Sequence, residues 1–414
     1  MFFNFLLTQK KFFSHIINKY NFVLALILIS SPKVFSNASS SDIPIRVLIK
    51  KINSTHKYIF NQTVNVSRNG SAFAIVEKSN SAELSPGSEK ITLTIQGKEF
   101  SGESFDFQSE ESFTEFEKKK YRGIIRFVCS GKSLLILNVL NLEDYLRGVL
   151  PSELGNIKSD SLKEAIEAFC ITSRTFALNR IKEKKKYYDL ESSVLSQVFS
   201  SVETENKLCN YAIDNTKSLI VSYEGKPAQV FYSSCCGGYI EDSRNVFNAT
   251  LIPYLKAHPD GEPANCRFSP FFKWQEEYSA EDIVNLLKSS GKKIGDSLEI
   301  TNMNITDIYE SGRAYSLDIH FSDSSVINIL SKDIRNIIKR KNGKGILKSS
   351  LFKVTEKFQG EKLDLIILEG KGNGHGVGLC QWGSFQLSKE GKSYSEILQF
   401  YFPQTKIINI NETN

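Results

Sequence analysis

The sequence predicts an α+β protein that has a β-rich N-terminal part, a helical core with strands, and an inserted smaller α+β module. Three observations support this prediction. Short alternating or β-branched runs fill residues 43–138, apolar residues at helical spacing begin after Asn141, and a separate mixture of helix and strand patterns runs from Trp274 to Leu368. The chain has 414 residues, of which 41% are hydrophobic and 24% are charged. It can therefore bury a full core, and intrinsic disorder is not expected.

Residues 1–36 have the features of an export signal. Lys10, Lys11 and Lys19 form a basic segment, residues 22–29 are a compact apolar run, and Ser36 can stand at the last position before a cleavage site. The apolar run is shorter than the roughly 20 residues that span a bilayer, although an uncleaved N-terminal anchor is the alternative. The chain is expected to be exported to the periplasm or the cell-wall compartment, with no membrane span beyond this segment.

The positive charge is concentrated in the same segment. Removing the four lysines of residues 1–36, which contain no acid, lowers the formal net charge from +6 to +2. A body this close to neutral lacks the basic surface that nucleic-acid binding requires, so no nucleic-acid partner is expected.

The β-rich region is predicted from short runs separated by clusters of Gly, Asn, Ser and Lys. The predicted strands cover residues 45–49, 64–66, 73–76, 91–95 and 134–139. The polar stretch 108–120 is predicted to be a loop or an exposed connection.

Two helices follow. Leu142, Tyr145, Leu146 and Val149 have the spacing of one helix face, and Asn141 is the expected N-cap. Pro151 is expected to end this helix. The second helix begins at Ser161 and carries one apolar stripe as far as Ile181.

The rest of the chain returns to strands and then to a mixed pattern. Strands are predicted at 218–223, 229–233, 303–309, 314–321 and 325–330, and helices at 280–289 and 394–401. A glycine-rich loop covers residues 370–378.

The chain contains seven cysteines, so at least one thiol stays unpaired in an exported protein unless it pairs between molecules. No two cysteines have the CxxC spacing, so the strong zinc patterns are absent. Cys235 or Cys236 is expected to form a disulfide with Cys266. No cofactor and no metal are expected.

Glu153 is the first candidate for chemistry. Its carboxyl follows Pro151 and is flanked by the apolar residues Val149, Leu150 and Leu154. Desolvation there would favour the acid form, as a general acid at neutral pH requires. The alternative is a carboxylate that only caps the following helix.

The second candidate is the segment Gly374–Gly383, which contains three alternating glycines, His375 and Trp382. Glycines allow a backbone to approach a ligand closely, while His375 offers a titratable group and Trp382 a stacking face. The spacing differs from the GxGxxG of dinucleotide-binding loops, and no βαβ unit surrounds it.

A set of blocks in a fixed order gives these residues a context. The blocks are Leu142–Glu153, Glu164–Ala177, Ser196–Phe199, Phe231–Gly238, Pro253–Leu255, Ser311–Ala314, Leu347–Phe352, Gly374–Gly383 and Ile397–Tyr401. In this order they resemble the stage II sporulation protein D/LytB (amidase enhancer) family over nearly all of the exported body. The block that ends at Gly383 is the most specific.

The resemblance implies a peptidoglycan lytic transglycosylase that acts in cell-wall remodelling at division or sporulation. Glu153 matches the family's essential glutamate, which would donate and then accept the proton as glycan strands without stem peptides are cut to 1,6-anhydro-muramic acid ends. Arg174 matches a helix arginine that would orient Glu153 or an acidic group of the substrate. The substrate-binding residues, expected to line one cleft with Glu153, are Gln197, Ser234, His375, Gln381 and Trp382.

The family also supplies the alternative function. Its LytB-type members are described as enhancers of a cell-wall amidase, and the chain would then be a non-catalytic glycan-binding activator with a cell-wall amidase as partner. The implied divisions are a signal (1–36), a β-rich region (43–138), a catalytic core in two parts (139–268 and 369–410) and an inserted module (269–368).

The chain departs from the family pattern at several positions. Glu167 and Phe169 stand where the family helix usually has Lys and Gln, and Leu154 replaces a common Met. Some members bind zinc through a His beside the Gly-Gly turn, where this chain has Ser233. His258 and the nearby cysteines could still gather a metal, but a disulfide or free thiols are preferred.

Overall fold

The computed structural model describes residues 43–155, 157–193, 197–247, 250–295, 297–341, 343 and 345–413. The predicted export signal, residues 1–36, lies outside these residues. Helices and many strands are both present, so the predicted α+β class is confirmed. In the described part of the chain no helix combines the length and the apolar character needed to cross a membrane.

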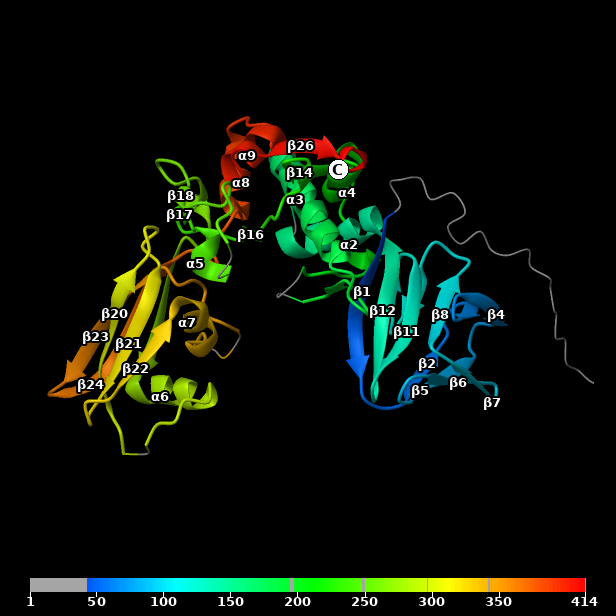
Figure 1. The fold of residues 1–414 in the computed structure, drawn as a ribbon, viewed down its shortest axis with the longest axis horizontal. Coiled ribbons are helices and arrows are strands. Elements are labelled where there is room, and N and C mark those ends of the chain that lie inside the picture. The colour runs from blue at the N-terminus through cyan, green and yellow to red at the C-terminus, as the bar shows by residue number, and fades with distance from the viewer. Residues whose placement is uncertain are drawn as a thin grey trace, which may run out of the picture. The chain divides into compact units, whose positions relative to one another are not determined.

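The N-terminal region is built on a seven-stranded sheet with the order β13-β1-β12-β11-β8-β3-β4 (Figure 1). All neighbours are antiparallel except β13, which runs parallel to β1. β12 lies between β1 and β11, and both of its faces are covered: Leu134 and Ile136 pack in the main core, and Leu135 and Leu137 in a second cluster. Seven of its nine residues are therefore buried. The strands are β1 (Pro44–Ile52), β3 (Val64–Arg68), β4 (Ser71–Val76), β8 (Ser104–Ser109), β11 (Ile124–Ser130), β12 (Ser133–Asn141) and β13 (Leu190–Glu191).

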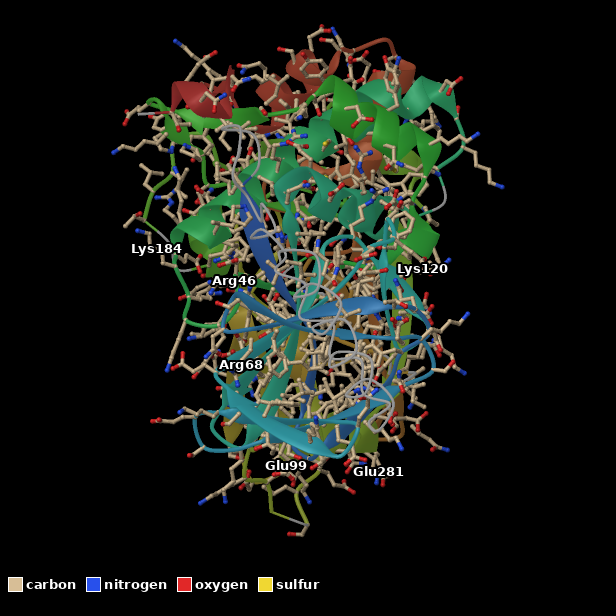
Figure 2. All side chains as sticks on the ribbon, turned by 90° about the vertical axis from the view of Figure 1, so that its right-hand side faces the viewer. Arg46, Arg68, Glu99, Lys120, Lys184 and Glu281 are labelled. Carbon is tan, nitrogen blue, oxygen red and sulfur yellow. The ribbon has the colours of Figure 1, made fainter. Side chains whose placement is uncertain are left out.

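A four-stranded antiparallel sheet, in the order β2-β5-β6-β7, completes this region. Its strands are β2 (His56–Ile59), β5 (Ser81–Pro86), β6 (Ile91–Ile95) and β7 (Lys98–Gly102). In β6 the alternating residues Ile91, Leu93 and Ile95 are buried, as the period of a strand requires. Charged side chains such as Arg68, Glu99 and Lys120 are exposed at the surface (Figure 2).

Residues 108–120, predicted to be a loop or an exposed connection, are mostly exposed but contain regular strands, so the loop prediction is wrong. The stretch contains the end of β8 and a hairpin of β9 (Thr114–Phe116) and β10 (Lys119–Tyr121). Phe116 and Tyr121 are buried, and the Tyr58 hydroxyl donates to the backbone carbonyl of Glu115. These two aromatic anchors within a polar sequence hold the hairpin against the core.

The first predicted helix is α2 (Leu142–Leu154), and its N-cap is confirmed, because the Asn141 side chain accepts a hydrogen bond of 2.8 Å from the Asp144 backbone. The predicted end at Pro151 is wrong. Proline lacks one backbone N–H, but here it lies in the last turn, where the Ser152 hydroxyl donates to the Gly148 carbonyl at 2.7 Å. The helix therefore continues far enough to carry Glu153.

The second predicted helix is α3 (Lys163–Lys182), which follows a 3-10 turn at Asp160–Leu162. Its buried residues are not confined to one stripe, because it contacts α2, α4 (Lys207–Asn215), α8 (Gln381–Lys389) and α9 (Tyr394–Tyr401). As a result, polar side chains such as Glu167 and Arg174 are buried and need partners inside the protein.

The remaining helical core combines short elements from distant parts of the chain. They are a 3-10 turn (Val202–Thr204), α4 (Lys207–Asn215), β14 (Leu219–Tyr223), β15 (Lys226–Pro227), β16 (Tyr232–Ser233), β17 (Tyr239–Ile240), α5 (Ser243–Phe247), β18 (His258–Pro259), a 3-10 turn (Asn265–Phe268), β25 (Leu379–Cys380), α8 (Gln381–Lys389), α9 (Tyr394–Tyr401), β26 (Lys406–Asn409) and a 3-10 turn (Ile410–Glu412). The predicted helix at 394–401 is confirmed, whereas α8 was not predicted because it begins with Gln381 and contains Gly383.

Residues 273–371 have a hydrophobic core of their own, which includes Trp274, Tyr278 and Leu368. The elements are β19 (Lys273–Ser279), α6 (Ala280–Ser289), β20 (Ile300–Ile308), β21 (Ala314–Phe321), β22 (Val326–Leu330), α7 (Ser331–Ile337), β23 (Phe352–Gln359) and β24 (Lys362–Lys371). They form two three-stranded sheets, β19-β24-β23 and β20-β21-β22. The predicted helix at 280–289 is confirmed, and Ser279 and Asp282 form its capping box.

Candidate functional site

Glu153 lies in the last turn of α2 and is half-buried. Its Oε1 atom accepts two hydrogen bonds, one of 2.7 Å from the Val198 backbone N–H and one of 3.2 Å from the Tyr232 hydroxyl. Both bonds end on the same oxygen. The proton of the acid form therefore belongs on Oε2.

Burial raises the pKa of Glu153 above its ordinary value. The hydrogen bonds from Val198 and Tyr232 favour the ionised form and lower the pKa, but they offset only part of the effect of burial. No second carboxyl contributes to this shift among the described residues. Glu153 is thus a single carboxyl whose acid form persists to higher pH than usual.

Gly148 allows the segment after Gln197 to lie against α2. A Cβ atom at Gly148 would come within 2.4 Å of the Ser200 carbonyl oxygen and 2.7 Å of the Phe199 ring. The ring of Phe199 stacks on Tyr145 of α2 at 5.3 Å between centroids. This close packing holds the backbone N–H of Val198 beside Glu153.

Gln197 is fully buried and directly precedes Val198, whose backbone N–H donates to Glu153. Its Oε1 accepts a hydrogen bond of 3.0 Å from the Tyr145 hydroxyl, whereas its Nε2 has no partner in the described part of the protein. The Gln197 side chain is also one of the groups that lower the pKa of Tyr232, so its amide lies beside the tyrosine that contacts Glu153.

Residues from the end of the chain reach the same place through β16 and β25, which pair in parallel with Tyr232 opposite Leu379. The Trp382 backbone N–H donates to the Ser234 carbonyl at 3.1 Å. Trp382 is half-buried and packs on Phe385 with ring centroids 5.7 Å apart, while Gln381 is buried. Of the predicted residues, Ser234, Gln381 and Trp382 thus lie together next to the tyrosine that contacts Glu153.

His375 lies beside the same strand but is not a titrating group at neutral pH. Its Nδ1 accepts a hydrogen bond of 3.0 Å from the Val377 backbone, and its ring packs on Phe231 and Phe247. Burial, then the nearby Arg335 and Arg313, lower its pKa to about 3. The imidazole is neutral, so the predicted titratable role is wrong.

The glycines around His375 approach the protein's own chain. A Cβ atom at Gly374 would lie 2.6 Å from the Ser233 Cβ, one at Gly376 2.1 Å from the Arg313 guanidinium, and one at Gly378 2.3 Å from the Phe231 carbonyl oxygen. The expectation that this loop needs glycine in order to approach a ligand is therefore corrected. Its glycines allow the loop to pack on the segment that carries Tyr232.

Arg174 does not contact Glu153 in the structure. Its guanidinium is fully buried and forms a bidentate pair with Glu143, with distances of 2.9 Å from Nε and 2.7 Å from Nη2. A third bond of 3.0 Å runs from Nη1 to the Leu219 carbonyl. The pair joins α2, α3 and β14, which indicates a positioning role in the core.

The expected disulfide is not formed. All seven cysteines are free thiols, and the Cys236 and Cys266 sulfurs lie 3.5 Å apart. A disulfide has an S–S distance of about 2.05 Å. His258 is not part of this cysteine group, since its Nδ1 lies 3.0 Å from the Pro259 carbonyl oxygen and its ring packs on Phe400.

Comparison with known proteins finds two matching sequence models and several similar chains. A sequence model described as "Stage II sporulation protein" matches residues 130–223, and a domain of unknown function (DUF8618) matches residues 255–378. An uncharacterized protein of Brachyspira hyodysenteriae is 30% identical over 314 residues, which cover 75% of this chain and 78% of that protein. The chain belongs to the stage II sporulation protein D/LytB family.

Two named members of the stage II sporulation protein D/LytB family are also similar to the chain. Stage II sporulation protein D of Bacillus subtilis is 28% identical over 282 residues, which cover 64% of this chain and 74% of that protein. The amidase enhancer of the same organism is 27% identical over 304 residues, which cover 63% of this chain but only 40% of that protein. Membership of this family supports a role related to the cell wall.

Sequence reasoning about this family member missed Tyr232 and Val198 as the partners of Glu153. They lie 79 and 45 residues from it along the chain. Both stand in or beside blocks that carry the family resemblance, at Phe231–Gly238 and Ser196–Phe199. The family resemblance of these two blocks was therefore the feature of the sequence that could have identified Tyr232 and Val198.

Proposed function

We propose that this chain is a peptidoglycan lytic transglycosylase in which Glu153 is the general acid and then the general base. The observation that carries the proposal is the carboxyl itself, which is half-buried, has a raised pKa, and accepts both of its hydrogen bonds on Oε1. A general acid needs a pKa near the working pH, and burial is the usual means of raising that of a glutamate.

In the proposed reaction the Oε2–H of Glu153 protonates the glycosidic oxygen that follows a muramic acid. The bond between that oxygen and C1 of the muramic acid breaks. The C6 hydroxyl of the same sugar attacks C1, and its proton returns to the Glu153 carboxylate. The products are a strand with a free hydroxyl and a strand with a 1,6-anhydro end, and no water is consumed.

A single carboxyl suits this chemistry better than hydrolysis. Most glycoside hydrolases use two carboxyl groups, about 5–9.5 Å apart, because one must act on water or on the sugar while the other protonates the leaving group. Among the described residues, only burial and the hydrogen bonds from Val198 and Tyr232 shift the pKa of Glu153. An intramolecular hydroxyl as nucleophile removes the need for a second acid.

Substrate binding is assigned to the groups beside Tyr232. The ring of Trp382 offers an apolar face for a sugar, and Gln197 Nε2 is a buried donor without a partner among the described residues. Ser234 and Gln381 adjoin Trp382 and supply polar groups. Arg174, through Glu143, positions α2 and does not contact the glycan.

Incubation of the purified chain with glycan strands stripped of stem peptides is expected to release fragments that end in 1,6-anhydro-muramic acid, identified by mass. Intact peptidoglycan serves as the comparison substrate and is expected to be cleaved less. Products that have gained a water molecule would identify a hydrolase, and intact strands after incubation would exclude the proposed activity.

A second candidate is a glycan-binding activator of a cell-wall amidase, because one relative carries the name amidase enhancer. This function predicts no cleavage of strands by the chain alone. It also predicts that a cell-wall amidase removes stem peptides faster in the presence of the chain than in its absence, and that this acceleration does not depend on Glu153.

Replacing Tyr232 by phenylalanine is expected to move the alkaline limb of the pH–rate profile upward. The Tyr232 hydroxyl stabilises the ionised form of Glu153, so its loss raises the pKa of the carboxyl further. A general acid loses activity as the pH rises through its pKa, and a higher pKa therefore preserves activity to higher pH. One hydrogen bond corresponds to a shift of about 0.4–1 pH unit. An alkaline limb that stays in place would show that Glu153 does not set it.

A further inference from the structure

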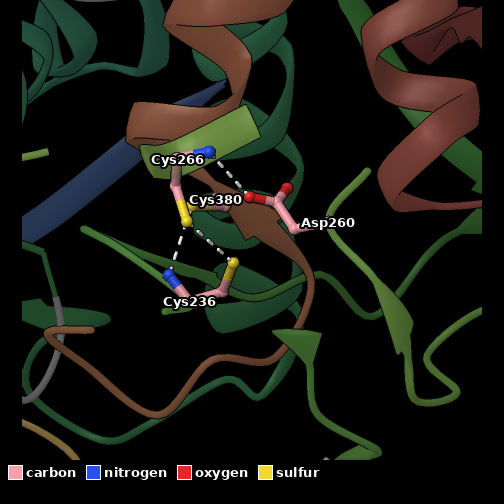
Figure 3. A group of neighbouring side chains, drawn as sticks. All are labelled: Cys236, Asp260, Cys266 and Cys380. Atoms are coloured by element: carbon pink, nitrogen blue, oxygen red, sulfur yellow. Dashed lines mark hydrogen bonds between the residues drawn. The ribbon is translucent and has the colours of Figure 1, made fainter. Parts of the chain in front are cut away.

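Four buried side chains from three separate segments converge at a point that the proposed reaction does not use. They are Cys236, Asp260, Cys266 and Cys380, and one sulfur or carboxylate oxygen from each lies within 4.8 Å of the others (Figure 3). Cys236 follows β16, Asp260 and Cys266 flank the turn after β18, and Cys380 ends β25 immediately before α8.

The spacing of these groups matches the ligands of one metal ion. Two thiolates bound to one tetrahedral zinc at Zn–S of about 2.3 Å stand about 3.8 Å apart. The Cys236 and Cys266 sulfurs are 3.5 Å apart, close to that edge and well beyond the roughly 2.05 Å of a disulfide. Three sulfurs and one carboxylate oxygen are donors that zinc accepts in a tetrahedral site.

Neighbouring groups hold the four side chains in place, as outer-shell partners do in metal sites. The Asp260 carboxylate accepts a bond of 2.8 Å from the Tyr401 hydroxyl on Oδ1 and one of 2.9 Å from the Cys266 backbone on Oδ2. The Cys236 backbone N–H lies 3.2 Å from the Cys380 sulfur and donates to it. Gly383 leaves the space that this arrangement needs, because a Cβ atom there would lie 2.1 Å from the Tyr401 hydroxyl oxygen.

A buried cation stands beside the group. The Arg313 guanidinium is almost fully buried and donates to the Cys236 carbonyl at 2.5 Å and to the Tyr239 carbonyl at 3.0 Å. Its Nε has no partner in the described part of the chain. Three thiolates and a carboxylate around a divalent ion leave a net negative charge, and the buried Arg313 guanidinium, which is bound to the Cys236 carbonyl, offsets part of it.

We propose that Cys236, Asp260, Cys266 and Cys380 bind one zinc ion in a closed structural site. Four protein ligands fill a tetrahedral shell and leave no position for substrate, so the ion ties segments together and takes no part in bond cleavage. Cys380 directly precedes Gln381 and Trp382, and the ion thereby holds the start of α8 against the strand that carries Tyr232. The proposal rests on the cysteine and aspartate geometry alone and is independent of the proposed enzymatic activity.

Metal analysis of the full chain, purified without chelator, is expected to give about one zinc ion per molecule. Replacing that ion by Co²⁺ should produce the near-ultraviolet absorption of sulfur-to-cobalt charge transfer. Cys266→Ser and Cys380→Ser are each expected to lose the zinc, whereas Cys129→Ser, which changes a buried cysteine of β11 outside the group, keeps it.

Two further variants test which side chains are the ligands. Asp260→Asn is expected to weaken zinc binding, and Cys235→Ser, which alters the cysteine next to the group, is expected to leave one zinc ion bound. Loss of zinc in Cys235→Ser with full retention in Asp260→Asn would overturn the assigned ligand set. Wild-type protein that carries no zinc, takes up no Co²⁺ and shows a Cys236–Cys266 disulfide on mass mapping would overturn the proposal, whether or not the variants fold.

Discussion

Glu153→Gln is expected to lower the rate of glycan-strand cleavage by about 10²–10⁴-fold, because glutamine can neither give up nor accept the proton that both half-steps need. Glutamine keeps the size of the side chain and an oxygen that can still accept the hydrogen bonds from Val198 and Tyr232. The variant should therefore fold and bind glycan normally. The measurement is the rate at which anhydro-ended fragments appear, compared at equal concentrations of folded protein.

Glu361→Gln is the matched control, since Glu361 is exposed in the turn between β23 and β24 and its loss should change neither cleavage nor folding. Glu153→Asp should also be slow, because the carboxyl is withdrawn by one methylene from the glycosidic oxygen. If the glutamine variant cleaves as fast as the wild type, Glu153 is not the acid. A capping role alone would leave cleavage intact and lower the free energy of unfolding by less than about 1 kcal/mol.

Arg174→Met is expected to lower the free energy of unfolding by about 3–5 kcal/mol, because it leaves the Glu143 carboxylate without its partner. The Arg174 guanidinium is fully buried and its two bonds to Glu143 are 2.9 and 2.7 Å long. Urea unfolding of wild type and variant measures the loss. Cleavage should fall only as far as the folded fraction falls.

Arg180→Met is the matched control on the same helix. Arg180 pairs with Glu183 near the exposed end of α3, where an ion pair contributes about 0–1 kcal/mol. Adding Glu143→Gln to Arg174→Met should recover part of the lost stability, since the uncompensated charge is removed. A stable Arg174→Met protein that no longer cleaves would instead assign Arg174 a direct part in the reaction.

The features predicted correctly from sequence depend on residues that are close along the chain. Asn141 caps α2 through Asp144, three residues later, and α6 begins at a capping box that is also local. The apolar spacing that predicts these helices follows from the 3.6-residue turn. Such features can be predicted because the chain supplies both partners within one turn.

The environment of the candidate site could not be predicted in this way, because its partners are distant in sequence. Glu153 was identified by its apolar neighbours and by family resemblance, but its pKa depends on burial and on the Tyr232 hydroxyl from β16. Arg174 was expected to orient Glu153 or an acidic group of the substrate, whereas the tertiary fold pairs it with Glu143. Cys380 was not connected with Cys236, 144 residues away, since no local spacing marks the group.

The antiparallel pairing of β19 with β24 has a consequence for the order in which the molecule forms. It sets Lys273 opposite Lys371, so the ends of the segment with its own core lie side by side. Without that pairing, joining β16 to β25 would close a loop of roughly 145 residues. Once β19 and β24 are paired, the length of unstructured chain in that loop is about three times shorter. The entropic cost of closing the loop is then lower by about 1 kcal/mol. The segment from β19 to β24 thus acts as an internal cross-link that makes late assembly of the distant strand pair less costly in chain entropy.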